Sequence, residues 1–140
     1  MKATIDDKGD QIVLTIDAAD DDRMRIGSDL LATVIESGYS SHWARFQHVQ
    51  SIRQGKRGIV LSVDVRACRE EDAVRILRPI SAHAMLVGCA RLLADPTVTN
   101  RYAVAAASAA LFRGHGDVDC DGPTADLILQ FAFYGKVVYA

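Results

Sequence analysis

The stretch that decides the fold is Ile59-Val-Leu-Ser-Val-Asp-Val65. Apolar side chains occupy every second position of it, which predicts a β-strand with one buried face. Residues 42–52 also suit an extended strand, and Gly55-Lys-Arg-Gly58 suits the tight turn between the two. We therefore predict a β-hairpin over residues 42–66.

Further β-structure is predicted on both sides of this hairpin. Residues 3–6 and 11–16 are β-type segments that flank the turn-like Lys8-Gly9-Asp10, so they are expected to form a second hairpin. Residues 73–77 suit a third strand beside the first hairpin, ended by Pro79. We expect the two hairpins to form one antiparallel sheet.

Helical patterns account for the other segments, each with capping residues at its ends. The expected helices run from Asp20 to Gly38, from Ser81 to Asp95-Pro96, from Asn100 to Phe112 and from Thr124 to Tyr134. The first helix is alternatively expected to begin at Ser28, because Gly27 weakens its first turn. Residues 137–139 are expected to form a closing strand. The last helix is apolar on nearly all sides and should be the most buried element. The predicted fold is α+β, with about four helices packed on the sheet and a helical C-terminal half.

Composition bounds the class of protein. The chain has 140 residues, 49% of them hydrophobic, and a formal net charge of −2, which suits one domain over residues 1–140. No apolar run approaches the roughly 18 residues of a spanning helix, and no signal-peptide pattern opens the chain, so we expect no membrane association. Three cysteines without CxxC spacing indicate a reducing compartment, and we expect a cytoplasmic protein.

The motifs that could carry catalysis or bind a metal are incomplete. Asp117-Val-Asp-Cys-Asp-Gly122 matches the first half of a calcium-binding loop, but Ile128 stands at the twelfth position, where a bidentate carboxylate is required. The four histidines lack HxxH or HExxH spacing, and the sequence has no GxSxG elbow and no phosphate-binding loop. We therefore expect no metal, no cofactor and no enzymatic activity.

Aromatic and basic residues gather in the 42–66 hairpin, which contains the chain's one tryptophan. Trp and Arg anchor many protein interfaces, whereas stacking on Trp beside Arg suits a nucleotide or nucleic acid. Alternatively, Trp43 and Phe46 fill the core, because large aromatic side chains dominate small cores. The candidate binding residues are Trp43, Arg45, Arg53, Lys56 and Arg57.

Charge is distributed unevenly along the chain. Residues 1–22 carry seven Asp against two Lys, whereas residues 23–78 carry ten basic residues against six acidic ones. Such a bipolar surface suits an oppositely charged macromolecule, although solvated surface charge is the more common explanation. A second candidate surface is acidic and consists of Asp20, Asp21, Asp22, Asp117, Asp119 and Asp121.

Two stretches resemble a family of small phage and prophage accessory proteins. The segment from Asp29 to Gly38, followed by Trp43, is similar to the family's helix before a Tyr-Trp pair, although His42 stands in place of the Tyr. The segment Ala125-Asp126-Leu-Ile-Leu-Gln130-Phe-Ala-Phe-Tyr-Gly-Lys-Val-Val-Tyr139 is similar to its C-terminal signature. With the helix between them, the resemblance covers about half of the chain.

The resemblance implies a biological context, that of phage proteins inside a host cell, but it does not imply a catalysed reaction. Small phage accessory proteins often act by stoichiometric binding to a host macromolecule, and inhibitors of host defence such as anti-CRISPR proteins are one such class. The expected partner is then a host protein or ribonucleoprotein complex in the host cytoplasm, and a homodimer is also compatible. The alternative function is a nucleotide- or nucleic-acid-binding module that uses the hairpin.

Overall fold

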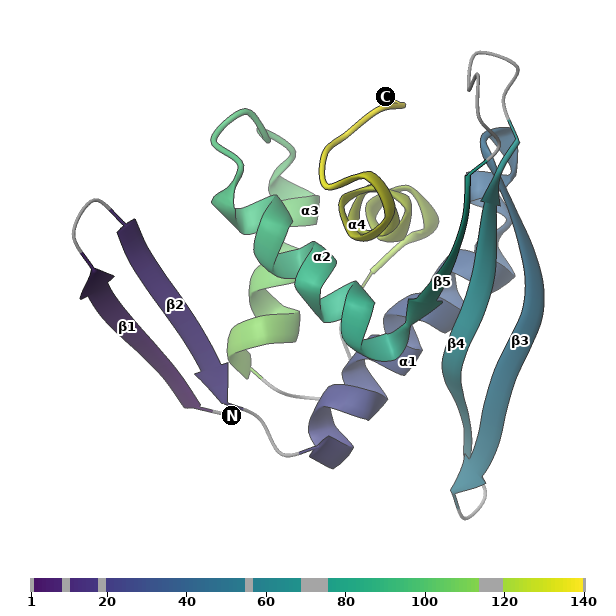
Figure 1. Cartoon of the computed structure of the whole chain (residues 1–140), viewed down its shortest axis with the longest axis horizontal. Coiled ribbons are helices and arrows are strands. Elements are labelled where there is room, and N and C mark those ends of the chain that lie inside the picture. The colour runs from purple at the N-terminus through teal and green to yellow at the C-terminus, as the bar shows by residue number, and fades with distance from the viewer. Residues whose placement is uncertain are drawn as a thin grey trace.

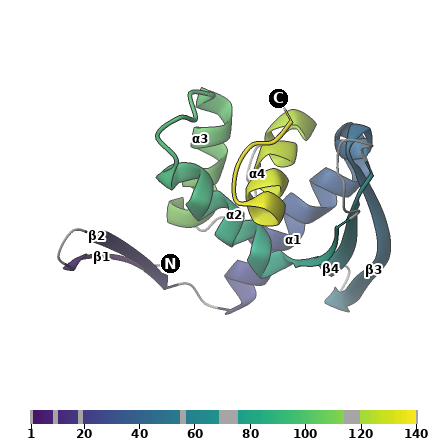
Figure 2. The ribbon, with the colours of Figure 1, turned by 45° about the horizontal axis from the view of Figure 1, so that its top comes forward.

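A three-stranded antiparallel sheet and a layer of helices make up the fold (Figure 1). The computed structural model describes residues 2–8, 11–17, 20–54, 57–68, 76–113 and 120–139, and the side chains of 25–53, 58–68, 76–112 and 120–139. Within these ranges the helices lie on one side of the sheet, which leaves its other face open, as the turned view in Figure 2 also shows. The predicted α+β class is confirmed.

The two predicted hairpins form, but they belong to separate sheets. β1 (Lys2–Lys8) pairs only with β2 (Gln11–Asp17), whereas β3, β4 and β5 form the larger sheet. The expectation of one shared sheet is therefore wrong. In the structure the first hairpin lies on the other side of the helices from the larger sheet (Figure 1).

The predicted 42–66 hairpin is present, and its register shifts between Gln47 and Gln50 and again between Gln50 and Ser51. β3 (Ala44–Gln54) and β4 (Arg57–Ala67) pair antiparallel from Ala44 opposite Ala67 to Gln54 opposite Arg57. Between Gln47 and Gln50 the register shifts, because β3 has a bulge there. The alternating residues of β4 bury one face, as predicted: Ile59, Val63, Val65 and Ala67 are buried.

The third strand lies later in the chain than predicted. β5 (Leu77–Ser81) contains Pro79 in its middle, whereas the sequence predicted a strand that Pro79 would end. β5 is an edge strand, since the strand order is β3-β4-β5, so the missing N–H of Pro79 need not cost a ladder bond. Of the predicted strand 73–77, residues 73–75 lie outside the described residues.

The helices begin and end close to the predicted residues. α1 (Asp20–Ser37) ends before Gly38, whose φ of 66° suits glycine, and α2 (Ala82–Ala94) begins after Ser81, whose hydroxyl accepts a hydrogen bond from the Ala84 N–H. The bounds of the other helical segments follow: the 3₁₀ turn η1 is Tyr39–His42, α3 is Arg101–Ser108, the π-helical turn η2 is Ala109–Arg113, and α4 is Gly122–Tyr134.

Two glycines allow helices to approach closely. α1 continues through Gly27, so the alternative start at Ser28 is wrong. Glycine is needed at this position because an added Cβ would lie 2.1 Å from the carbonyl oxygen of Ala82. Likewise, an added Cβ at Gly88 of α2 would lie 2.6 Å from the carbonyl oxygen of Ile128 in α4. These contacts bring α1 and α4 against α2, so glycine at both positions serves packing.

Helix α4 is the centre of the core, as the sequence predicted. Eight of its thirteen residues are buried, among them the polar Asp126 and Gln130. The predicted closing strand over 137–139 is wrong: these residues form no strand, and the Gln130 side chain binds their backbone instead. No helix in the described part of the chain combines the length and apolar character needed to cross a membrane.

Candidate functional site

The uncovered face of the larger sheet is the candidate site. Its side chains come from positions that alternate with the buried ones, and the register sets them in rows across the strands. We call this surface the open face; its residues are Arg45, Gln47, Gln50, Ser62, Asp64, Arg66, Leu77 and Pro79. It is polar over most of its area and has Leu77 at one edge.

Two arginines lie directly opposite each other on the open face. Arg45 of β3 pairs with Arg66 of β4, and Leu77 of β5 continues the row. Side chains at such positions approach within roughly 5 Å at Cβ, so two like charges there destabilise the sheet. The sequence analysis missed Arg66, although its place between the buried Val65 and Ala67 was a readable signal that it faces outward.

The two guanidinium groups differ in their contacts. Arg45 donates through Nη1 to the carbonyl oxygens of Ser41 and, at 3.1 Å, of Ala44, which holds its side chain toward η1. Within the described part of the chain, the guanidinium group of Arg66 makes no hydrogen bond or ion pair. The two arginines therefore differ in how firmly the described residues hold them.

A strained residue lies beside this row. His48, in the bulge of β3, has a φ of 52°, a left-handed conformation that is uncommon for residues other than glycine. Its Nδ1 lies 3.0 Å from Oδ2 of Asp64 on β4, and the imidazole is largely exposed. Strained backbone of this kind is concentrated at functional sites, so the bulge supports a binding role for this part of the sheet.

The other predicted basic residues are only partly placed. Arg53 is exposed near the end of β3. Arg57 begins β4, but its side chain is not among those described, and Lys56 lies outside the described residues. Val49 and Ile52 add exposed apolar surface to β3. The surface at this end of the hairpin is therefore mixed, basic and aliphatic.

Trp43 is not on this surface. Its side chain is 0% exposed, so the expectation that it contacts a partner is wrong and the alternative that it fills the core is confirmed. The indole Nε1 donates to Oδ1 of Asp126 at 2.7 Å, and its ring packs against Phe133 and Tyr139. The reason is topological: the turn η1 directs Trp43 toward α4 before β3 begins.

Asp126 connects three segments of the core. Its Oδ1 also accepts a hydrogen bond from Oγ of Ser40 at 2.6 Å, and its Oδ2 accepts one from Nε2 of Gln130 at 2.8 Å. All four residues are buried. We call them the Asp126 network; they link η1 and the start of β3 to α4, and so fix the sheet relative to the helices.

The predicted acidic surface is placed only in part. Asp20, Asp21 and Asp22 lie in the first turn of α1, with side chains that are not described, and Asp117 and Asp119 lie outside the described residues. Asp121 is the N-cap of α4, where Oδ1 accepts a hydrogen bond from the Thr124 N–H at 2.9 Å. Hydrogen bonds from the side chain and backbone of Thr124 hold the pKa of the Asp121 carboxyl below its usual value.

The described residues do not bring together three or more groups that could hold a metal ion. Asp121, which the calcium-loop pattern included, instead caps a helix.

Cys89 is expected to resist alkylation in the folded protein. Burial, and then the nearby Cys120, raise the pKa of its thiol to about 12, so it stays protonated at neutral pH. In a labelling experiment at pH 8 followed by peptide mapping, Cys89 should react roughly a hundredfold more slowly than the half-buried Cys68, because the thiolate is the nucleophile. In denaturant all three cysteines should react alike, and equal native rates would contradict the burial of α2.

Comparison with known proteins identifies no relative of this chain. No protein-family model matches the chain, and no curated protein or solved structure shows significant similarity to it.

Proposed function

We propose that the chain is a non-enzymatic protein that acts by stoichiometric binding, and that its open face contacts a partner protein through acidic groups of that partner. The observation that carries this proposal is the cross-strand pair of Arg45 and Arg66. Two like charges opposite each other cost the sheet stability, and a carboxylate of the partner would turn that cost into a favourable contact.

A protein partner accounts for this surface better than a nucleic acid does. The exposed aliphatic side chain of Leu77 accompanies the arginines on the open face, and Val49 and Ile52 are exposed elsewhere on β3; such a mixture is typical of protein interfaces. Moreover, the aromatic ring on which bases would stack, Trp43, is inside the core.

The resemblance to phage and prophage accessory proteins suggests which partner to seek. Under this proposal the chain works in the host cytoplasm and binds a defence component, for example a protein subunit of a CRISPR–Cas ribonucleoprotein complex, as anti-CRISPR proteins do. A basic contact surface would then meet an acidic patch of that subunit, and the charge complementarity would also speed association.

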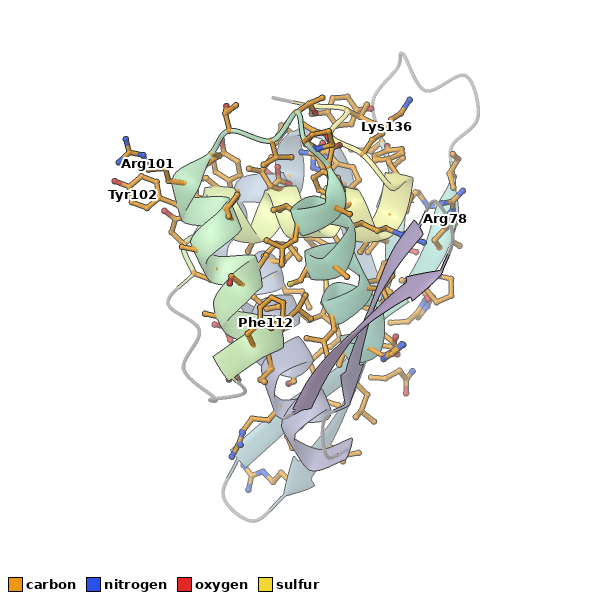
Figure 3. All side chains as sticks on the ribbon, turned by 90° about the vertical axis from the view of Figure 1, so that its left-hand side faces the viewer. Arg78, Arg101, Tyr102, Phe112 and Lys136 are labelled. Atoms are coloured by element: carbon orange, nitrogen blue, oxygen red, sulfur yellow. The ribbon has the colours of Figure 1, made fainter. Side chains whose placement is uncertain are left out.

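Arg45→Glu should weaken partner binding without harming the fold. The new carboxylate would face Arg66 across the strands, so the like-charge pair becomes an opposite-charge pair. This gain offsets the loss of the hydrogen bonds from Arg45 to Ser41 and Ala44 at the exposed surface, so stability should stay about equal. Binding to an acidic partner should fall by roughly tenfold or more, the loss that about 1.4 kcal/mol produces. Arg101→Glu is the matched control, since Arg101 is also exposed but points outward from α3, across the helical layer from the sheet (Figure 3).

The measurement is capture of partners from bacterial lysate by the parent and both variants, with and without nuclease, followed by affinity measurement on the purified partner. The proposal holds if a protein is captured after nuclease treatment, is lost with Arg45→Glu and is kept with Arg101→Glu. Nuclease-sensitive capture would favour the nucleic-acid alternative. Equal capture by all three proteins would move the contact surface away from the open face.

A further inference from the structure

The segment after α4 is held by one buried side chain. The amide oxygen of Gln130 accepts hydrogen bonds from the N–H groups of Val138 at 2.9 Å and Tyr139 at 2.8 Å. Its Nε2 donates to the carbonyl oxygen of Tyr139 at 2.9 Å. We call residues 136–139 the tail. The tail is thus recognised through its backbone, and the N–H groups of two consecutive residues converge on one amide oxygen.

Loss of the tail from Gln130 would lower the stability of the folded protein. Gln130 is fully buried, and its Nε2 also donates to Asp126, so the amide uses both donors and two acceptor positions. If the tail left, three of these four hydrogen bonds would be lost inside the core, where unsatisfied polar groups are costly. Gln130 is therefore best satisfied when a peptide backbone occupies the site.

The site also selects an aromatic side chain. The ring of Tyr139 stacks on Trp43 with centroids 5.8 Å apart and an interplanar angle of 28°. His42 and Tyr134 contact the same ring edge-on, at 6.2 and 6.0 Å. We call Gln130, Trp43, His42 and Tyr134 together the tail-binding site. Its contacts fit a peptide segment with an aromatic residue at the position of Tyr139.

The connection between α4 and the tail is short and simple. Gly135 has a φ of 77°, which turns the chain back toward the body, and Lys136 and Val137 follow as exposed residues. Val138 is the first tail residue whose backbone Gln130 binds. If residues 135–137 straightened, they would span roughly 10 Å and carry residues 138–139 away from their own subunit.

We propose that the tail-binding site also accepts the tail of a second copy of this chain, which gives a dimer with exchanged tails. The same sequence from another copy offers every backbone group and the tyrosine ring that the site already binds. Only the turn at Gly135 differs between the closed monomer and the exchanged dimer. Exchange of an identical segment is a low-cost route to dimers when a hinge opens.

Gly135→Ala should shift the equilibrium toward the dimer. A left-handed φ is strained for alanine, and the strain applies to the closed turn but not to a straightened one. Since two turns open per dimer, the dimer dissociation constant should fall by roughly thirtyfold or more. Gly38→Ala is the control for backbone strain alone, because Gly38 has a φ of 66° and similarly open surroundings but lies outside the segment that joins α4 to the tail.

Sedimentation velocity over a range of concentrations tests this shift, and a mixing experiment identifies the segment exchanged. Trp43 is the only tryptophan, so in a mixture of Tyr139→Ala with Trp43→Phe the fluorescence comes from the copy that lacks its own tyrosine ring. Titration with Trp43→Phe should restore the parent's fluorescence saturably, because its intact tail binds in trans. The double variant Trp43→Phe/Tyr139→Ala should have no such effect.

Two results would overturn the proposal. One is a fluorescence titration in which the double variant acts like Trp43→Phe, or in which neither changes the signal. The other is equal dimerisation of Gly135→Ala and Gly38→Ala. The mixing experiment needs no change at Gly135, so it remains decisive if Gly135→Ala does not fold.

Discussion

Replacing Asp126 with alanine should lower the free energy of unfolding by about 3 kcal/mol or more, a large loss for a single substitution. The carboxylate accepts three hydrogen bonds, from Ser40, Trp43 and Gln130, and all of these donors are buried. Truncation would leave the donors without partners inside the core, and each unsatisfied group adds to the cost. Denaturant unfolding followed by the fluorescence of Trp43 is a direct measurement.

The helix itself offers the control. Asp121→Ala removes an N-cap from the same helix but at an exposed position, so it should cost only about 1 kcal/mol. A pH series tests the contribution of Asp121 by itself, because the pKa of its carboxyl is lowered in the folded protein. Its contribution to stability is present above the unfolded-state pKa and is lost as the pH falls through the folded-state value. If the two alanine variants were equally stable, the Asp126 network would not hold the core together.

A double-mutant cycle tests the bond between Trp43 and Asp126. Trp43→Phe keeps an aromatic ring in the core and removes the indole N–H, so it should destabilise the parent. In the Asp126→Ala background the same change should cost less, since the N–H has already lost its acceptor. Additive losses would contradict a direct interaction between the two side chains.

The sequence predicted those elements that depend on local patterns. The alternation from Ile59 to Val65 and the capping residues Ser81 and Asn100 act over a few neighbours, and the hairpin and helices that they indicate are present. The partition into two sheets could not be predicted in the same way. It depends on how segments distant in the chain pack together, and neither periodicity nor turn chemistry specifies that packing.

The candidate site was predictable to a similar degree. Alternation along β4 was enough to place Arg66 outward, and the register of the hairpin sets it opposite Arg45. The burial of Trp43 was not decidable locally, because its hydrogen-bond partner Asp126 is 83 residues later. One signal was present nonetheless: Asp126 and Gln130 are four residues apart in an otherwise apolar helix, a spacing that brings two polar side chains together on one face.

Phe131→Ala and Leu129→Ala should be among the most destabilising substitutions in the chain. Both side chains are buried in the middle of α4, where α2 and α1 also pack. Removing them leaves cavities that close packing cannot fill, at a cost of about 3–5 kcal/mol for Phe131 and about 2–5 kcal/mol for Leu129.

Leu127→Ala is the matched control for these two, since Leu127 lies in the same helix but is only partly buried. Its truncation removes the same atoms as Leu129→Ala but leaves a site that solvent already reaches, so the loss should be clearly smaller. Denaturation midpoints at an unchanged slope measure all three on one scale. If Phe131→Ala and Leu129→Ala unfolded like the parent protein, α4 would be peripheral, and the close crossing of Gly88 against Ile128 would lose its role in holding the helical layer together.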